Sequence, residues 1–335
     1  MNAIRRTTWA LAAGLALMST AMAQAPAPAQ DAASYPNRPV KVIVGWAAGG
    51  ATDVIARVLS EKWSKSMGQS FVVDNKPGAG GIMGADALAK SPPDGYTISV
   101  FLSATLTANQ FVYNKLPYNP DKDFALITHL TNGAVVLAAR PETPYATARE
   151  FADYIKAHPG KVKYGSYGTG SFGHVIMAYI DEMQRGQMTH VPYKGETPLL
   201  QDLVGGSVEL ALVSVANSEQ HVKAGKLKYL GVTGPKRLQA LPNVPTLAEQ
   251  GLDEVPLKMV GWTGIAAPAG TPKPIIDKLV AETHKALQDP AVQARIMGFG
   301  NEVVTNGTPA EALARYKADV PIWKKLVDLS GARAN

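Results

Sequence analysis

The sequence contains no cysteine among its 335 residues. That absence excludes disulfide bonds, thiol catalysis, thiolate metal sites and iron–sulfur clusters. The six histidines show no metal-ligand spacing such as H-x-x-x-H, which would place two ligands on one helical face. We therefore expect neither a bound metal nor a cofactor.

The sequence also lacks a recognisable catalytic arrangement. A serine nucleophile elbow requires the pattern G-x-S-x-G, but Ser166 and Ser171 stand in G-S-x-G contexts. Paired carboxylates such as Asp181 and Glu182 are typical of a solvated helix face. We expect a protein that is not an enzyme. An exported hydrolase is the alternative, and it would need a nucleophile–base pair that the sequence does not reveal.

No block of like charge stands out. The net charge is +6 at pH 7, and lysine and arginine are distributed among aspartate and glutamate. Nucleic-acid recognition favours a clustered basic face, so we expect no nucleic-acid partner. A mild positive field would still help to attract anionic ligands.

One long apolar segment lies near the start of the chain. MNAIRR, TTWALAAGLALM and STAMA form the pattern of a secretory signal peptide over residues 1–23, with cleavage after Ala23. An uncleaved anchor is the alternative, although the apolar run falls short of the roughly 20 residues that span a bilayer. Residues 24–34 predict a flexible leader, and ordered structure should begin near Tyr35. We expect the mature protein outside the inner membrane.

After the leader, apolar strands alternate with segments of helical spacing. VKVIVGW, SFVVDN and YTISVFL are examples of the strands. Such alternation predicts an α/β fold with parallel, doubly wound sheets. The strands are too numerous for one compact sheet, so we expect two lobes joined by two crossing strands. Lobe 1 comprises residues 35–128 and 261–335, lobe 2 comprises residues 129–260, and the crossings fall near 125–135 and 255–265.

Two local signals mark helix starts near the C-terminus. Thr308 with Glu311 predicts a capping box before the last helix. Asp289 followed by Pro290 predicts a break between two helices.

Four loops follow predicted strands, at the strand ends where ligands bind in open α/β sheets. The first loop is GWAAGGATD, residues 45–53. Its glycines permit a sharp turn and a close approach of the backbone, and the free amides of the next helix attract an anion. A tight turn without a ligand is the alternative. The candidate ligand-binding residues here are Trp46, Ala47, Ala48, Gly49, Gly50, Thr52 and Asp53.

The second and fourth loops give weaker signals. The second loop, residues 102–109, offers hydroxyl groups just after a strand, and its candidates are Ser103, Ala104 and Thr105. Such hydroxyls often only cap a helix. In the fourth loop, residues 191–198, Tyr193 either faces a cleft or packs as a half-buried ring.

The third loop is YGSYGTGSFGHV, residues 164–175. It matches G-x-G-x-x-G, but as a dinucleotide fingerprint the match is weak because no acidic partner follows the next strand. We interpret the loop as a cradle for an oxyanion, formed by Gly168, Thr169, Gly170 and Ser171. His174, at the start of the next helix, could donate to the same anion. The alternative is a helix-terminal histidine at the lobe surface.

Several longer stretches resemble a known family. They are YPNRPVKVIV, GGATDVIAR, VVDNKPGAGGIMGADALAKSPPDGYT, LPYNPDKDFALIT, HPGKVKYGSYGTGSFGH, HVPYKG, DLVGGSVEL, HVKAGKLKYLGVTGPKR, LPNVPTLAEQG and GIAAPAGTP. From about Tyr35 to the C-terminus, the chain resembles the tripartite tricarboxylate transporter receptor family, also called Bug proteins.

The resemblance implies a periplasmic solute-binding protein with a two-lobed Venus-flytrap fold, similar to the type II periplasmic binding proteins. It implies that backbone amides and hydroxyls hold a ligand carboxylate between the lobes. Lobe 1 would contribute Ala47 to Asp53, with Ser103 to Thr105 nearby, and lobe 2 would contribute Gly168 to Ser171 and His174. The implied partners are the inner-membrane permease subunits of a tripartite tricarboxylate-type transporter. We expect the receptor itself to be a monomer.

Three positions depart from the family pattern. Trp46 stands where many members have Phe, Phe172 stands where small polar residues are common, and Val213, beside Ser214, replaces an aspartate of many members. The missing aspartate argues against an ammonium-bearing ligand. Together these residues predict an apolar pocket for an aromatic mono- or dicarboxylate such as terephthalate. An aliphatic di- or tricarboxylate similar to citrate is the alternative, as is a sensor that signals through a membrane kinase.

Overall fold

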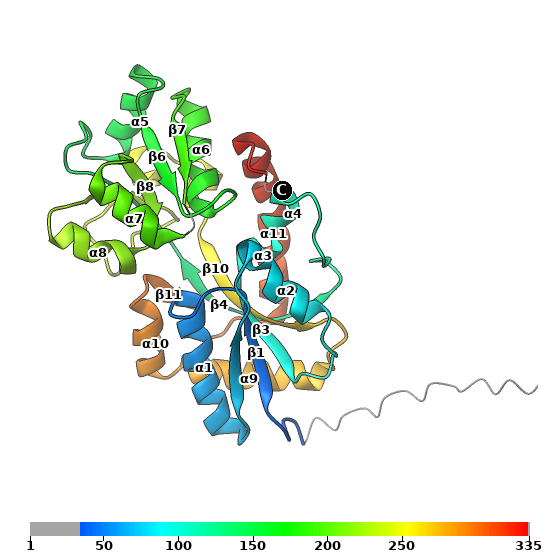
Figure 1. The fold of residues 1–335 in the computed structure, drawn as a ribbon. Helices are drawn as coiled ribbons and strands as arrows, with labels where there is room; N and C mark the ends of the chain where they lie inside the picture. Colours follow the sequence, from blue (N-terminus) through cyan, green and yellow to red (C-terminus); the bar gives the residue numbers. More distant parts are fainter. Residues whose placement is uncertain (1–33, 194, 334–335) are drawn as a thin grey trace, which may run out of the picture. The chain divides into compact units, whose positions relative to one another are not determined.

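The computed structural model describes residues 34–193 and 195–333. The expected signal peptide and nearly all of the expected leader lie outside the described residues. Two separate β-sheets organise the chain from Pro36 onward, each covered by helices (Figure 1). This α/β architecture is the fold class that the alternation of strands and helices predicted.

The first sheet has six strands, ordered β11-β4-β10-β3-β1-β2. Their bounds are β1 (Val40–Val44), β2 (Phe71–Asn75), β3 (Thr97–Leu102), β4 (Phe124–Gly133), β10 (Gly261–Pro268) and β11 (Asn301–Val303). The central strands are almost wholly buried and apolar, as in VKVIV of β1 and GWTGIAAP of β10. The short edge strand β11 was not anticipated from the sequence.

The second sheet has five strands, ordered β7-β6-β8-β5-β9. Their bounds are β5 (Val136–Ala139), β6 (Lys163–Ser166), β7 (Thr189–Pro192), β8 (Leu210–Val213) and β9 (Lys228–Val232). All four residues of β5 and of β8 are buried, so these two strands form the centre of the second lobe.

The expectation of parallel sheets was wrong, because both sheets are mixed. In the first sheet, β1 runs parallel to β2 and β3, but β10 is antiparallel to β3 and β4. In the second sheet, β5 is antiparallel to both of its neighbours. The edge strand β11 is also antiparallel to β4, whereas the reversed strands β10 and β5 each directly follow a passage from the other sheet. They therefore enter against the direction that the local strand–helix repeats set up.

The chain passes between the sheets twice. Only Ala134 and Val135 separate β4 from β5, and the return path runs from the end of β9 to the start of β10. Val135 and Thr233 hold the two passages together: the Val135 amide donates to Thr233 Oγ1 at 3.1 Å, and the Thr233 amide donates to the Val135 carbonyl at 2.9 Å. Two lobes are thus joined by two adjacent strand segments.

Helices cover the sheets, and most follow the predicted segments. Their bounds are α1 (Ala51–Met67), α2 (Ile82–Ala89), α3 (Ser103–Leu106), α4 (Asn109–Val112), α5 (Ala148–Ala157), α6 (Phe172–Gln184), α7 (Glu196–Gly205), α8 (Val215–Lys223), α9 (Lys273–Leu287), α10 (Pro290–Met297) and α11 (Pro309–Ser330). Short 3₁₀ turns occur at η1 (Ala79–Gly81), η2 (Ala248–Gln250) and η3 (Val255–Lys258). None of the helices in the described ranges combines the length and apolar character needed to cross a bilayer.

Both predicted helix starts are confirmed. Thr308 and Glu311 form a capping box at α11, in which each side chain accepts a backbone amide of the other residue. Asp289 is the N-cap of α10, and its side chain accepts from the Ala291 amide at 2.8 Å.

The last helix packs against both lobes. Near its N-terminal half, Tyr316 belongs to the buried cluster of the first sheet. Towards its C-terminus, Trp323 meets the Phe172 ring of α6 at 5.9 Å between centroids, in a cluster that also holds Ile176 of α6. The α11 helix therefore buries apolar surface in the two lobes at once.

Candidate functional site

The first loop leads into α1 with an uncapped N-terminus. Gly50 is the N-cap residue, in extended conformation at φ −76° and ψ 167°, and no side chain caps the helix. Ala47 to Gly50 are exposed, whereas Thr52 is buried inside the first helical turn. A helix start of this kind has unpaired backbone N–H groups and a partial positive charge. The first loop thus presents backbone donors at an exposed turn.

Asp53 is buried and holds the shape of the first loop. Its Oδ2 accepts from the Gly49 amide and from Arg57 Nε, each at 2.9 Å, and its Oδ1 accepts from Asn75 Nδ2 at 2.9 Å. Burial opposes the ionisation of Asp53, but the hydrogen bonds from Arg57, Gly49 and Asn75 outweigh burial and lower its pKa. We expected Asp53 among the ligand-binding residues. In the structure, its carboxylate accepts hydrogen bonds from the first loop and from the neighbouring Arg57 and Asn75.

Asn75, the last residue of β2, completes this network. Its Nδ2 donates to the Trp46 carbonyl at 3.0 Å, and its Oδ1 accepts from Arg57 Nη2 at 3.0 Å. Asn75 thereby ties the carbonyl of Trp46 to the neighbouring strand. Asn75 was not predicted from the sequence as part of this loop, because 29 positions separate it from Trp46.

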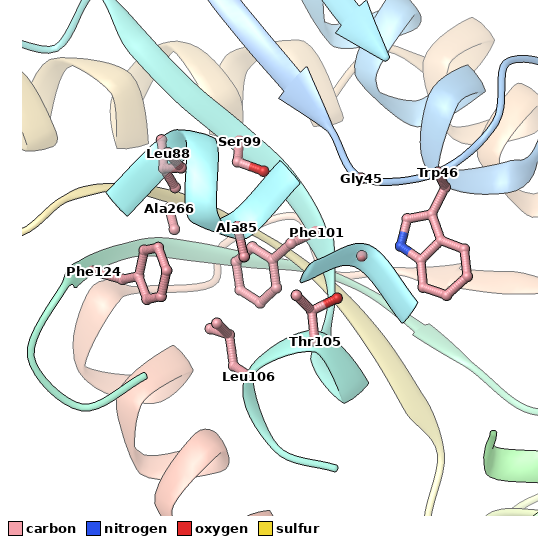
Figure 2. Close-up of a pocket in the computed structure, with 11 residues that line it drawn as sticks. Gly45, Trp46, Ala85, Leu88, Ser99, Phe101, Thr105, Leu106, Phe124 and Ala266 are labelled. Carbon is pink, nitrogen blue, oxygen red and sulfur yellow. The ribbon is translucent and has the colours of Figure 1, made fainter. Parts of the chain in front are cut away.

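Trp46 is half-buried, and its indole nitrogen is shielded from solvent without a hydrogen-bond partner in the described part of the chain. A Cβ added to Gly81 would lie 3.5 Å from this nitrogen and 2.6 Å from Thr105 Oγ1. Figure 2 shows the indole at one edge of a small pocket whose walls include Leu88 and Phe101. The pocket volume is about 10 Å³, which is room for a single water. This pocket is too small to hold a dicarboxylate.

The hydroxyl groups of the second loop serve the fold. Ser103 is buried, and its Oγ accepts from the Trp262 amide at 3.3 Å. Thr105 is also buried, and its hydroxyl donates to the Gly80 carbonyl at 3.4 Å. Ala104 packs on a buried apolar cluster. We expected all three near the ligand, but the structure gives both hydroxyls partners inside lobe 1.

The third loop is closed by hydrogen bonds among its own residues. Ser171 is the N-cap of α6 and accepts from the His174 amide at 3.3 Å, while the Ser171 amide donates to the Gly168 carbonyl at 3.1 Å. The Gly170 amide donates to His174 Nδ1 at 3.0 Å. Thr169 is exposed at the tip. The expectation that His174 donates to an anion therefore fails at Nδ1, because this nitrogen accepts from the loop backbone.

His174 lies against a second histidine. The rings of His174 and His190 are stacked, with centroids 3.8 Å apart and planes 6° apart. Burial lowers the pKa of His174 to about 4. Burial, together with the neighbouring His174, lowers the pKa of His190 to about 4 as well. Both imidazoles are therefore neutral at neutral pH.

Two residues expected to shape an apolar ligand pocket lie in the core instead. Phe172 is 8% exposed and packs edge-on against Trp323. Val213 is fully buried in β8, where it pairs with Val136 of β5. Phe172 thus packs against α11, and Val213 lies in the centre of the second sheet.

The remaining candidates also have internal partners. Tyr193 donates its hydroxyl to Asp202 Oδ2 at 2.8 Å, and burial together with Asp202 raises its pKa to about 12. Ser214 gives its amide and its hydroxyl to the Glu196 carboxylate. No three histidine, aspartate or glutamate side chains of residues 34–193 and 195–333 cluster in a way that would hold a metal ion.

The first and third loops each lie against neighbouring parts of the segments 79–81 and 103–112. Gly81 lies beside Trp46 of the first loop, and the carbonyl of Gly80 accepts from Asn109 at 3.0 Å. Three residues later, Val112 touches the third loop: a Cβ on Gly170 would lie 2.6 Å from Val112 Cγ2. The φ of Gly170 is +75°, so glycine meets both the conformation and the close approach. The two candidate loops, one from each lobe, thus flank one short helical segment.

Residues 55–328 match the model of the tripartite tricarboxylate transporter family receptor. The chain belongs to this family. The fold is correspondingly the two-lobed fold of its periplasmic binding proteins.

Three solved receptors illustrate the likeness. The periplasmic binding protein BugD is 35% identical, with 90% of this chain and 100% of that chain covered and a TM-score of 0.77. Rpa4515 of R. palustris, solved with adipate, is 30% identical, with 90% and 100% covered and a TM-score of 0.79. MatC from Rhodopseudomonas palustris, with bound malate, is 33% identical, with 88% and 100% covered and a TM-score of 0.76.

Within this receptor, the residues that position the loops were harder to find from sequence than the loops. His190 lies 16 residues beyond His174 and reaches the third loop through Ser166, with Nε2 2.7 Å from the serine hydroxyl. Glu196 supplies the carboxylate at Ser214. Both residues lie on neighbouring elements of the second lobe, His190 within β7 and Glu196 at the start of α7.

Proposed function

We propose that this receptor captures a small carboxylate between its first and third loops. The uncapped N-terminus of α1, beside an exposed glycine turn, carries the proposal. A carboxylate placed there would satisfy free backbone amides and face the positive end of the helix dipole. Val112 and Gly80 connect this turn to the third loop, so a ligand bound at the turn would lie close to both lobes.

We further propose a dicarboxylate as the ligand class. Two related receptors were solved with adipate and with malate, and both compounds carry two carboxylates. An aromatic ligand such as terephthalate rests on Trp46 alone, since Phe172 and Val213 are buried in the core. The half-buried indole still borders the first loop, so it would report on a ligand there and could pack against an aromatic ring.

The cellular role follows from the family. We propose that the mature protein works in the periplasm and delivers its ligand to the membrane subunits of a tripartite tricarboxylate-type transporter. A ligand that touches both loops would favour the approach of the lobes, and the adjacent strands at Val135 and Thr233 would act as the hinge.

A titration of purified residues 24–335 tests the proposed ligand class. Adipate, malate, succinate, citrate, terephthalate and benzoate are added while tryptophan fluorescence and heat are recorded. Because residues 24–335 contain four tryptophans, the Trp46→Phe variant identifies the signal of the first loop. We expect saturable one-to-one binding of at least one dicarboxylate and a fluorescence change that Trp46→Phe abolishes.

The outcomes separate the alternatives. Tight binding of terephthalate, weakened in Trp46→Phe, would support the aromatic ligand. Binding of adipate or malate alone would exclude it and retain the dicarboxylate. Failure of every acid to bind would overturn the proposed function.

A further inference from the structure

Three aromatic rings form a continuous stack beneath the third loop. Tyr164 of β6 lies 5.0 Å from His190 of β7, with 23° between the ring planes, and His190 lies 3.8 Å from His174 of α6. Phenylalanine or leucine would fill such a space without desolvating any polar atoms. The two imidazoles therefore require an explanation other than packing.

Each imidazole contacts a different point of the third loop. His174 Nδ1 accepts the Gly170 amide at 3.0 Å. His190 Nε2 lies 2.7 Å from Ser166 Oγ, and that hydroxyl also donates to the Gly168 carbonyl at 3.1 Å. The loop is thus attached on both sides of Thr169, and the attachments share one stacked pair of rings.

We propose that His174 and His190 are positioning residues that hold the third loop in its ligand-binding conformation. This inference rests on the proposed function of the loop. His174 acts as the acceptor that orients the peptide of Gly170, while His190 orients Ser166 and, through it, Gly168. Neither side chain needs to touch the ligand.

The arrangement requires neutral rings. A proton on His174 Nδ1 would replace the acceptor of the Gly170 amide with a second donor, and the hydrogen bond would be lost. Two imidazolium charges at a centroid distance of 3.8 Å would also repel each other. The loop attachment should therefore weaken when the pair becomes protonated in acid.

The surroundings add little charge to the pair. Burial alone lowers the pKa of His174, and the pKa of His190 responds to burial and to His174. The charged groups on and around α6 act on other residues: Asp181 on Tyr164, Glu254 on Tyr179, and Glu196 on Tyr167. From α11, Lys325 lies over the Tyr179 ring. Protonation of the pair is thus governed by burial rather than by a nearby carboxylate.

Four variants separate positioning from packing. His174→Asn retains an acceptor near the place of Nδ1 but does not titrate, whereas His174→Leu removes the acceptor. His190→Gln and His190→Leu form the corresponding pair at the Ser166 contact. At pH 7.5, we expect His174→Leu and His190→Leu to weaken binding of the best acid more than tenfold, and the amide variants to remain within about threefold of wild type.

The amide of Gly170 provides a readout that does not depend on the ligand. Labelling with ¹³C-carbonyl threonine and ¹⁵N-glycine selects the Thr–Gly peptides, which are those of Gly170, Gly234 and Gly264. We expect the Gly170 resonance to move with a midpoint near pH 4 in the wild type and to remain still in His174→Asn. Gly234 and Gly264 serve as internal references.

The results distinguish the possible failures. The positioning role would be overturned by wild-type affinity in folded His174→Leu. It would also be overturned by a Gly170 resonance that does not shift when His174 is protonated. If His174→Leu does not fold, the pH titration of the Gly170 resonance in the wild type and in His174→Asn still tests the positioning role of His174. If no acid binds the wild type, the proposed function fails, and the resonance alone shows whether His174 controls the loop.

Discussion

Glu196 and Ser214 are joined by two hydrogen bonds, in which the carboxylate accepts both the amide and the hydroxyl of the serine. Ser214 is the N-cap of α8, so a carboxylate of the protein already occupies that helix N-terminus. At the start of α1, the Asp53 carboxylate accepts the Gly49 amide, and no side chain caps the helix at Gly50. The amides of the first turn of α1, beside the first loop, are where we propose that an external carboxylate binds.

The role of Glu196 gives a first prediction. Glu196→Ala removes the acceptor of the Ser214 amide and of Asn217 Nδ2, so we expect a loss of about 1–2 kcal/mol in the free energy of unfolding. Glu196→Gln keeps one oxygen acceptor and should lose less than half as much. Urea unfolding measures both variants. Equal stability of Glu196→Ala and wild type would show that the carboxylate does not support α8.

Asn75 should affect binding as well as stability. Asn75→Ala removes the donor to the Trp46 carbonyl and one donor to Asp53, which leaves the first loop less well held. We expect a loss of about 1–2 kcal/mol in stability and at least fivefold weaker binding of the best acid in calorimetry. Asn243→Ala, at an exposed loop position, is the matched control. Unchanged affinity in Asn75→Ala would remove Asn75 from the account of the site.

The glycines of the two loops should respond differently to alanine. At Gly170 the φ is +75° and a Cβ would lie 2.6 Å from Val112, so Gly170→Ala should cost about 2 kcal/mol or more through strain and a lobe-to-lobe clash. At Gly50 the φ is −76° and a Cβ would lie 3.6 Å from the Ala47 carbonyl. Gly50→Ala should change stability by less than about 1 kcal/mol. Thermal unfolding of the two variants side by side would reject this difference if their midpoints agreed.

Acid should destabilise the fold through the histidine pair. An exposed histidine titrates near pH 6.5, and burial lowers the pKa of His174 and His190 to about 4. Between these values the unfolded chain binds more protons than the folded protein, so the free energy of unfolding falls as pH decreases from 6.5 towards 4. A difference of one between the folded and unfolded pKa of a group corresponds to about 1.4 kcal/mol.

His174→Asn isolates this contribution from the carboxylates. Its stability should decline less steeply than that of wild type over the same pH window, as measured by urea unfolding at pH 7, 5.5 and 4.5. Asp181, whose pKa is raised by burial, favours the folded state in acid and is common to both proteins. Identical slopes for the variant and the wild type would contradict the low pKa of His174.

The sequence predicted local structure better than it predicted the direction of side chains. The capping box at Thr308 and the N-cap at Asp289 depend on residues close in the chain, and both are confirmed. The orientation of Phe172 depends on Trp323, which is 151 residues away. Val213 lies in a strand buried on both faces, where the alternation of polar and apolar residues that reveals an exposed face is absent.

The glycine turns were predicted from the sequence, but the residues that form hydrogen bonds to the loops and to α8 were not. Asn75, His190 and Glu196 reach the first loop, the third loop and α8 from neighbouring strands or helices. Which polar side chain lies against which loop depends on which strands are neighbours in the sheet. Here neighbouring strands are often far apart in the sequence, because the chain crosses between the lobes. Spacing along the chain carries no information about that order.

A crystal structure of the mature protein with its tightest-binding dicarboxylate tests the central claim most directly. The account predicts one carboxylate within hydrogen-bond distance of backbone amides at the start of α1, and contacts from the same ligand to the third loop near Gly168–Ser171. A carboxylate bound in another part of the protein, or to one lobe without approaching the first loop, would contradict it.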